Sequence, residues 1–185
     1  MSITIALDEK QQRRSAWRAT VRSRVGYNPA VTSELPHFVI HVADANDLSA
    51  VASLRALWDD ADDHDLEGRI ASWLAAEGDR RTIWLASVSD SPVGMASMFE
   101  YRRMPHPGRP DSRWGYVGNM FVREEFRDRG IGSALLVALI AAADERSYVR
   151  LVVSPSVRAQ SLYRRAGFIV PDSAGDDRLF VRRPS

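Results

Sequence analysis

The sequence predicts an α/β fold with a mixed central sheet and helices on both of its faces. The first observation is the order of the apolar patterns, which reads strand, two helices, three strands, helix, strand, helix and two strands. The second is the length of 185 residues with 45% apolar residues, which suits one domain with one core. The third is residues 133–146, where leucine, isoleucine and alanine form one apolar stripe of a helix.

The chain is expected to consist of a leader, residues 1–36, and a single domain, residues 37–185. In the leader, Trp17, Val21 and Val25 recur at helical spacing with arginines between them. This pattern is typical of a surface helix or a partly ordered arm, and contact with a membrane or nucleic acid is the alternative.

The first half of the domain is expected to contain a strand, two helices and a β-hairpin. β-rich residues predict strands over 38–42, 82–88 and 93–101. Asp44 is a typical cap for a helix that runs to Trp58, and Gly78 ends a second helix that begins near Leu66. The residues Asp90 to Pro92 favour a turn between the two hairpin strands.

The second half alternates strands and helices after a loop over residues 102–113 that contains three prolines. Ser154 and Pro155 are a typical helix start, and Gly167 is a typical helix end. The expected strands are Trp114–Val122, Val149–Val153, Phe168–Val170 and Arg178–Val181, and the expected helices are Ser133–Arg146 and Ser154–Ala166.

Composition excludes several classes of function. The chain has no cysteine, which excludes disulfides, thiolate metal ligands and cysteine nucleophiles. Its four histidines are scattered, so no metal site is expected. The longest uncharged run, Gly130 to Ala143, is too short to span a bilayer, and no signal pattern opens the chain. We therefore expect a cytoplasmic protein that binds neither membrane nor, lacking a broad basic surface, nucleic acid.

The segment Arg127 to Gly132 has the chemistry of an anion site. It follows a strand and opens a long helix, and its two glycines let the backbone approach a ligand closely. The helix N-terminus contributes about half a positive charge, and Arg127 and Arg129 add charge-assisted donors, which together suit a pyrophosphate. An ordinary glycine turn is the alternative; the dinucleotide and nucleotide-triphosphate fingerprints are both absent.

Two longer motifs give this segment a context. Met120-Phe121-Val122, a polar bend and Arg127-Asp128-Arg129-Gly130-Ile131-Gly132 form the first motif. Residues 156–168 form the second, with Ala159, Leu162-Tyr163 and Gly167-Phe168 at its fixed positions. Both motifs, at this separation, resemble those of the GCN5-related N-acetyltransferases, so a GNAT-like acyl-CoA N-acyltransferase fold is expected. Ser156 departs from the family pattern, which usually has asparagine there.

The resemblance implies acetyl-CoA as the acyl donor. The amide-rich pantetheine arm would pair with the strand over residues 118–122, and the pyrophosphate would bind the amides of residues 129–133. A backbone N–H near Phe121 or Val122 would stabilise the thioester oxyanion. The implied cofactor contacts are Met120, Phe121, Val122, Arg127, Asp128, Arg129, Gly130, Ile131, Gly132, Ser133, Ser156, Ala159 and Tyr163.

Two residues are expected to exchange protons during the reaction. The resemblance places Tyr163 near the CoA sulfur, where its phenol could protonate the leaving thiolate, although an amphipathic helix can also bury a tyrosine for packing alone. The strand over residues 114–122 has no carboxylate to act as base. Glu100 is the best substitute, with a solvated strand end as the alternative, and Asp111, His64 and His106 are weaker candidates.

The acceptor is expected to be a primary amine, either a small molecule or a peptide. In the resembled family the connection between the first two helices borders the acceptor pocket. Carboxylates at Asp59, Asp60, Asp62 and Asp63 would attract a cationic amine there, although they also suit a solvated loop. A non-catalytic acyl-CoA-binding or regulatory module with the same fold is the alternative function. The oligomeric state stays open, a homodimer included.

Overall fold

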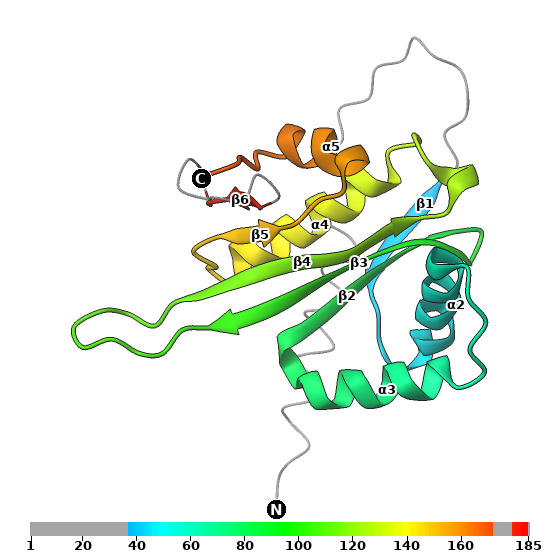
Figure 1. The fold of residues 1–185 in the computed structure, drawn as a ribbon, viewed down its shortest axis with the longest axis horizontal. Coiled ribbons are helices and arrows are strands. Elements are labelled where there is room, and N and C mark those ends of the chain that lie inside the picture. Colours follow the sequence, from blue (N-terminus) through cyan, green and yellow to red (C-terminus); the bar gives the residue numbers. More distant parts are fainter. Residues whose placement is uncertain (1–36, 172–178, 185) are drawn as a thin grey trace, which may run out of the picture. The chain divides into compact units, whose positions relative to one another are not determined.

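The structure, a computed structural model, describes residues 37–171 and 179–184, and the leader predicted for residues 1–36 lies outside this part. The described residues form a six-stranded sheet in the order β1-β2-β3-β4-β5-β6 (Figure 1). Among the strands that the structure describes, only β4 and β5 run parallel to each other, so the predicted mixed sheet is confirmed. The strands are β1 Phe38–Val42, β2 Arg81–Val88, β3 Ser91–Arg102, β4 Arg113–Val122, β5 Leu151–Val153 and β6 Phe180–Arg182.

Helices cover both faces of the sheet, as the sequence predicts. They are α2 Leu48–Asp59, α3 Leu66–Glu77, α4 Ile131–Glu145 and α5 Gln160–Arg165. On one face, Val51 and Leu54 of α2 form a buried cluster with Ile83, Leu85 and Met95 of the sheet, and α3 packs against it. On the other face, a Cβ placed on Gly94 would lie 3.4 Å from Leu135 of α4. Because neighbouring strand residues point to opposite faces, α4 covers the face opposite α2 and α3.

The helix ends predicted in the first half of the domain are confirmed, and the hairpin turn is shifted toward the N-terminus. The side chain of Asp44 accepts a hydrogen bond from the amide of Asn46, and Gly78 ends α3 with a φ of 61°. The hairpin turn, however, lies at Ser89 and Asp90, and β3 begins at Ser91. Both turn residues have positive φ, 47° and 63°, which is the geometry that matches the twist of two-residue hairpins.

The second half differs from prediction at the ends of its elements. The helix after Pro155 begins later, because Ser156 is extended and a short 3-10 turn, Val157–Ala159, precedes α5. A residue before proline is disfavoured in helical conformation, which keeps Ser154 out of the helix. Val149 is 46% exposed and lies before β5, so the predicted strand is shorter than its apolar run.

The C-terminal strands are also shorter than predicted. The predicted strand Phe168–Val170 is reduced to a single bridge between Ile169 and Val181. The final strand begins at Phe180, and Arg178, where the prediction began it, lies outside the described residues. None of the described helices is long and apolar enough to cross a membrane.

Candidate functional site

The parallel strands β4 and β5 separate near the middle of β4. Within the described residues, the two strands pair only where Gly115–Val117 lies opposite Leu151–Val153. β4 then continues to Val122, whereas the chain after β5 turns away toward α5. The edge of β4 over residues 118–122 is therefore left without β5 as a partner. An extended, amide-rich ligand can add to such an edge through main-chain hydrogen bonds.

A β-bulge distorts β4 at the point where the two strands separate. Gly118 pairs with Ser97 and Phe121 with Met95, so Asn119 and Met120 lie opposite the single residue Ala96. Asn119 has a φ of 50°, a left-handed conformation that asparagine tolerates better than most residues. Bulges re-aim backbone and side-chain groups and are enriched beside active sites.

The bulge is fixed by a short chain of hydrogen bonds. The side-chain Nδ2 of Asn119 donates a hydrogen bond to Ser97 Oγ at 3.0 Å. Ser97 Oγ in turn donates to the backbone carbonyl oxygen of Gly118 at 3.2 Å. Ser97 is buried on the sheet face that α2 and α3 cover, and it bridges β3 to β4. This pair therefore places polar side chains beside the free edge of β4.

The turn before α4 leaves the first backbone N–H groups of the helix without hydrogen-bond partners among the described residues. Asp128 and Gly130 have φ values of 60° and 83°, and Gly130 caps α4 without a side-chain hydrogen bond. The first bond of the helix joins the Ala134 amide to the Gly130 carbonyl, so the amides of residues 131–133 have no partner inside the helix. Uncapped amides at the positive end of a 15-residue helix form a ready anion site.

Two arginines flank this turn in different ways. Arg127 donates from Nε to the Val122 carbonyl at 3.0 Å and pairs with Glu124 at 3.4 Å, which fastens the turn to the end of β4. Arg129 is exposed, with its guanidinium 5.6 Å from the Phe126 ring. Arg127 therefore positions the turn, while Arg129, which forms no ion pair with another described residue, can meet an anion.

The second motif lies directly beside the first. A Cβ placed on Gly132 would lie 3.7 Å from Leu162 of α5 and 3.9 Å from Val122 of β4. Ser156 is exposed before α5, and its hydroxyl makes no capping hydrogen bond. Ala159 is half-buried at the start of the same helix. The fold thus brings residues about 30 positions apart in the sequence close together.

Tyr163 is the one buried residue of α5. Its ring packs edge-to-face against Phe168, with ring centres 5.4 Å apart. Burial, together with the nearby Tyr116, raises the pKa of Tyr163 to about 12. The phenol is therefore protonated throughout the neutral range and can only donate its proton in this environment.

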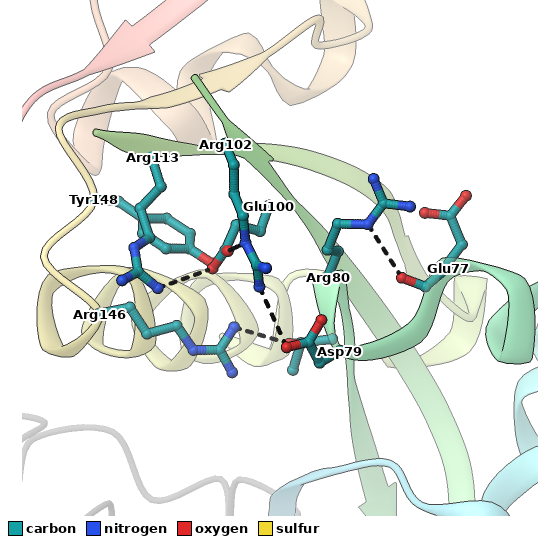
Figure 2. Close-up of polar contacts among 9 residues, drawn as sticks. Glu77, Asp79, Arg80, Glu100, Arg102, Arg113, Arg146 and Tyr148 are labelled. Atoms are coloured by element: carbon teal, nitrogen blue, oxygen red, sulfur yellow. Dashed lines mark hydrogen bonds and ion pairs between the residues drawn. The ribbon is translucent and has the colours of Figure 1, made fainter. Parts of the chain in front are cut away.

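Glu100 is held in a polar network at the other end of β3 (Figure 2). Its carboxylate accepts hydrogen bonds of 2.6 Å from both the Tyr148 hydroxyl and Arg102 Nε, and Arg113 lies 3.6 Å away. Burial raises the pKa of Glu100, but the hydrogen bonds from Tyr148 and Arg102 and the charges of Arg102 and Arg113 lower it by more. The net pKa is below the ordinary value, which opposes a role as proton acceptor near neutral pH.

The register also places Glu100 away from the bulge. Glu100 pairs with Gly115, whereas the bulge lies opposite Ala96. Four residues of strand correspond to about 13 Å. Because Ser97 and Glu100 are three residues apart on one strand, they point to opposite faces of the sheet. The structure therefore does not bring Glu100 together with Tyr163 and the β4 edge.

A pocket of about 440 Å³ lies between α2, α3 and the sheet, on the same face as Ser97. Its polar lining residues are Arg55, Arg69, Ser97 and Asn119, and most of its other lining residues are apolar. Asn119 belongs both to this pocket and to the bulge, so the pocket reaches β4 at the point where β4 and β5 separate.

The acidic segment lies beside this pocket without lining it. Asp59 pairs with Arg55 at 2.8 Å, and Asp63 pairs with Arg69. Asp60 ends α2 with a φ of 48°, and both it and Asp62 are exposed. The four predicted acceptor-binding carboxylates thus divide into two that pair with pocket arginines and two that face solvent.

The remaining base candidates are not gathered at the bulge either. His106 and Asp111 lie in the loop between β3 and β4, and Asp111 lines a separate hollow with Arg102 and Arg113. His64 is exposed in the connection between α2 and α3. Sequence reasoning missed Arg55, Arg69, Ser97 and Asn119. Only Asn119 gives a local signal, as an asparagine inside an apolar strand.

The chain is similar to known proteins of one family. The family model described as "Acetyltransferase (GNAT) family" matches residues 43–168, more than half of the chain. The chain is 28% identical over 122 residues to the uncharacterized N-acetyltransferase YafP of Escherichia coli (strain K12), which covers 62% of this chain and 69% of that protein.

Solved structures share the fold. A predicted acetyltransferase with acetyl-CoA from Clostridium acetobutylicum has a TM-score of 0.60 and 22% identity, covering 76% of this chain and 95% of that chain. A ribosomal-protein-alanine N-acetyltransferase from Brucella melitensis biovar Abortus 2308 has a TM-score of 0.60 and 24% identity, with 76% and 96% covered. At these identities the likeness establishes the fold alone.

Proposed function

Because the chain belongs to the GNAT family of acetyltransferases, we propose that it uses acetyl-CoA to acetylate a primary amine by direct attack on the thioester. One observation carries this proposal: the free edge of β4 ends at the uncapped N-terminus of α4, with Tyr163 on the neighbouring helix. In CoA an amide-rich arm is joined to a pyrophosphate, so the arm could lie along the edge of β4 while the pyrophosphate lies at the N-terminus of α4.

The donor would be held mainly by backbone groups. The amides of residues 131–133 and the Arg129 guanidinium would bind the pyrophosphate. The edge of β4 over residues 118–122 would pair with the pantetheine amides, with the Ser156 hydroxyl and Ala159 bordering the arm. Met120 and Asp128 contribute backbone to the same path, at the bulge and the turn.

The reaction then needs three groups from the protein. A backbone N–H near Phe121 or Val122 would stabilise the oxyanion that forms as the amine nitrogen bonds to the thioester carbon. Tyr163 would donate its proton to the sulfur as the carbon–sulfur bond breaks, and the proton that the amine loses to water would return Tyr163 to its protonated form. Because a thiol with a pKa of about 8.5 is already a fair leaving group, Tyr163 should assist without being indispensable.

The acceptor amine would enter from the pocket that reaches Asn119. Ser97 and Asn119 would orient the amine, which loses its proton to water in the pocket. Glu100 remains the base predicted from sequence, but its two ion-paired oxygens and opposite-facing position favour a structural role. Asp60 and Asp62, exposed beside the pocket, would attract an acceptor that is cationic at neutral pH.

Two experiments on the full chain test this function. Acetyl-CoA at about 100 times its Kd should stabilise the protein by about 2.7 kcal/mol, seen as a rise in Tm. A panel of primary amines with acetyl-CoA should then release free thiol. No Tm shift at millimolar acetyl-CoA would contradict the donor site. Binding without thiol release from any amine would instead favour the non-catalytic acyl-CoA-binding module.

A further inference from the structure

The acceptor pocket has a polarity that points to one class of amine. We propose that the acceptor carries an anionic oxygen group, a carboxylate or a phosphate, and that Arg55 and Arg69 bind this group. The inference rests on the proposed function, since it assigns the acceptor of the same reaction. It names a substrate class: small amines with an apolar body and an anionic end.

The pocket has a buried floor, formed by residues of the sheet, and a more exposed rim, formed by the two arginines. Ile83, Met95 and Ser97 of the sheet are buried at its floor. The side chains of Arg55 and Arg69 are 37% and 66% exposed, so the two guanidinium groups lie at the open side. A ligand whose amine meets Asn119 therefore extends over an apolar surface toward two cations.

The arginines keep donors for a ligand. Each guanidinium carries five N–H donors, and among the described residues each makes one ion pair, Arg55 with Asp59 and Arg69 with Asp63. None of the described side chains that line the pocket is a carboxylate. Guanidinium groups bind carboxylate and phosphate through paired, charge-assisted hydrogen bonds, which favours an anion at the rim.

Aromatic stacking holds Arg55 in place. Its guanidinium lies 4.7 Å from the centre of the Trp58 ring, and Trp58 in turn stacks on Phe121 at 5.7 Å with an interplanar angle of 11°. Phe121 lies just after the bulge in β4. Arg55 is thus connected by two packed rings to the strand that faces the donor, so its position relative to the acetyl group is set before a ligand arrives.

A purely cationic amine fits this lining less well. The lining offers a cation no carboxylate, because Asp59 and Asp63 are paired with the two arginines and, like Asp60 and Asp62, lie outside the lining. An amine with an anionic group suits both the exposed carboxylates and the pocket rim. Its ammonium group is attracted by Asp60 and Asp62, and its anionic group is attracted by the arginines. The volume of about 440 Å³ is in the range of small-molecule sites, which favours a small acceptor over a peptide.

Matched pairs of amines test the proposal on the full chain with saturating acetyl-CoA. The pairs are ε-aminocaproate with pentylamine, phenylalanine with phenethylamine, and phosphoethanolamine with ethanolamine, so that carboxylate and phosphate are tested separately. We expect at least one member with an anionic group to exceed its partner without that group in kcat/KM by about tenfold or more. Arg55→Gln and Arg69→Gln should each reduce that preference by about tenfold, with acetyl-CoA affinity unchanged.

Two control variants separate the pocket charge from general effects. Arg103→Gln removes an exposed arginine of the β3–β4 loop and should leave the preference unchanged. Asp59→Asn removes the partner of Arg55 but keeps the guanidinium, so the preference should be kept or increased. An equal loss in Arg103→Gln, or equal rates for both members of every pair, would overturn the proposal.

Direct binding distinguishes this inference from the reaction itself. Calorimetry of the same pairs with the CoA-saturated protein measures acceptor binding without turnover. If anionic amines bind in an Arg55- and Arg69-dependent way but no thiol is released, the pocket assignment stands and the transfer proposal fails. If thiol is released but binding and rates ignore the anionic group, the transfer proposal stands and this inference fails.

Discussion

The donor segment and the acceptor pocket are built in opposite ways. The donor segment, residues 118–133, is one continuous strand, turn and helix, and its proposed contacts are largely backbone amides. The pocket takes its side chains from α2, α3, β2, β3 and β4. A site made of backbone can be encoded by glycines and dihedral angles within a short segment. A site made of side chains depends on how distant elements pack.

The largest effect should come from placing charge in the donor segment. In Gly132→Asp the new Cβ has room, since the nearest side-chain atom is 3.7 Å away, so the fold should be kept. A carboxylate there would oppose the pyrophosphate, and acetyl-CoA affinity should fall by about a hundredfold or more, roughly 3 kcal/mol. Calorimetry with Gly132→Ala as the uncharged control measures this. Wild-type affinity in both variants would place the pyrophosphate elsewhere.

Tyr163→Phe tests the buried tyrosine of α5, the helix that lies against the donor segment at Gly132. Loss of the phenol should lower kcat by about ten- to a hundredfold, with little change in acetyl-CoA affinity. Because the pKa of Tyr163 is raised to about 12, its proton is retained at every lower pH. The wild-type rate should therefore show no loss from Tyr163 ionisation below about pH 10. An unchanged kcat, with chemistry shown to limit the rate, would leave Tyr163 as a packing residue.

Asn119 belongs to both regions, because it is part of the β4 bulge in the donor segment and also lines the pocket. Its variants therefore distinguish the role of its backbone in β4 from the role of its side chain in the pocket. Asn119→Gly keeps a residue that tolerates the φ of 50° while removing the amide. We expect kcat/KM for the acceptor to fall by about fivefold to fiftyfold, the loss of one or two hydrogen bonds. Acetyl-CoA affinity should stay the same. A parallel loss of donor binding would show that the side chain supports β4 rather than the acceptor.

Glu100→Gln should affect stability more than rate, because Glu100 lies in neither region. The free energy of unfolding should fall by about 1–3 kcal/mol as the buried network loses its charge, and kcat should change by less than about threefold. The pKa of Glu100 is lowered in the folded state, so its contribution is present above about pH 4.3 and is lost as pH falls through the lowered value. A hundredfold loss of kcat would restore Glu100 as the base.

The smallest effect is expected from the exposed carboxylates beside the pocket. Asp60→Asn combined with Asp62→Asn should lower kcat/KM for a cationic acceptor by about two- to fivefold at low salt. The loss should disappear as salt rises, because exposed charges are screened over about 10 Å at 0.1 M. Rates that are insensitive to both the substitutions and salt would identify a merely solvated loop.

Much of the fold was predictable because its signals are local. The capping side chain of Asp44, the left-handed end of α3 at Gly78 and the leucine stripe of α4 each act within a few residues. The errors lie at element ends, such as the hairpin turn, which the sequence placed at Asp90 to Pro92 and the structure places at Ser89 and Asp90. There the register of the whole sheet decides the position of the turn.

The sequence alone determined the turn and helix of the proposed donor segment, since glycines at 130 and 132, a following helix and a preceding strand fix its backbone. Only the tertiary structure decided the acceptor side. It directed Glu100 to the opposite face and into ion pairs, and it brought Arg55, Arg69 and Ser97 around one pocket. The physical reason is range: backbone geometry depends on neighbours in sequence, whereas the surroundings and pKa of a side chain depend on residues that only folding brings near.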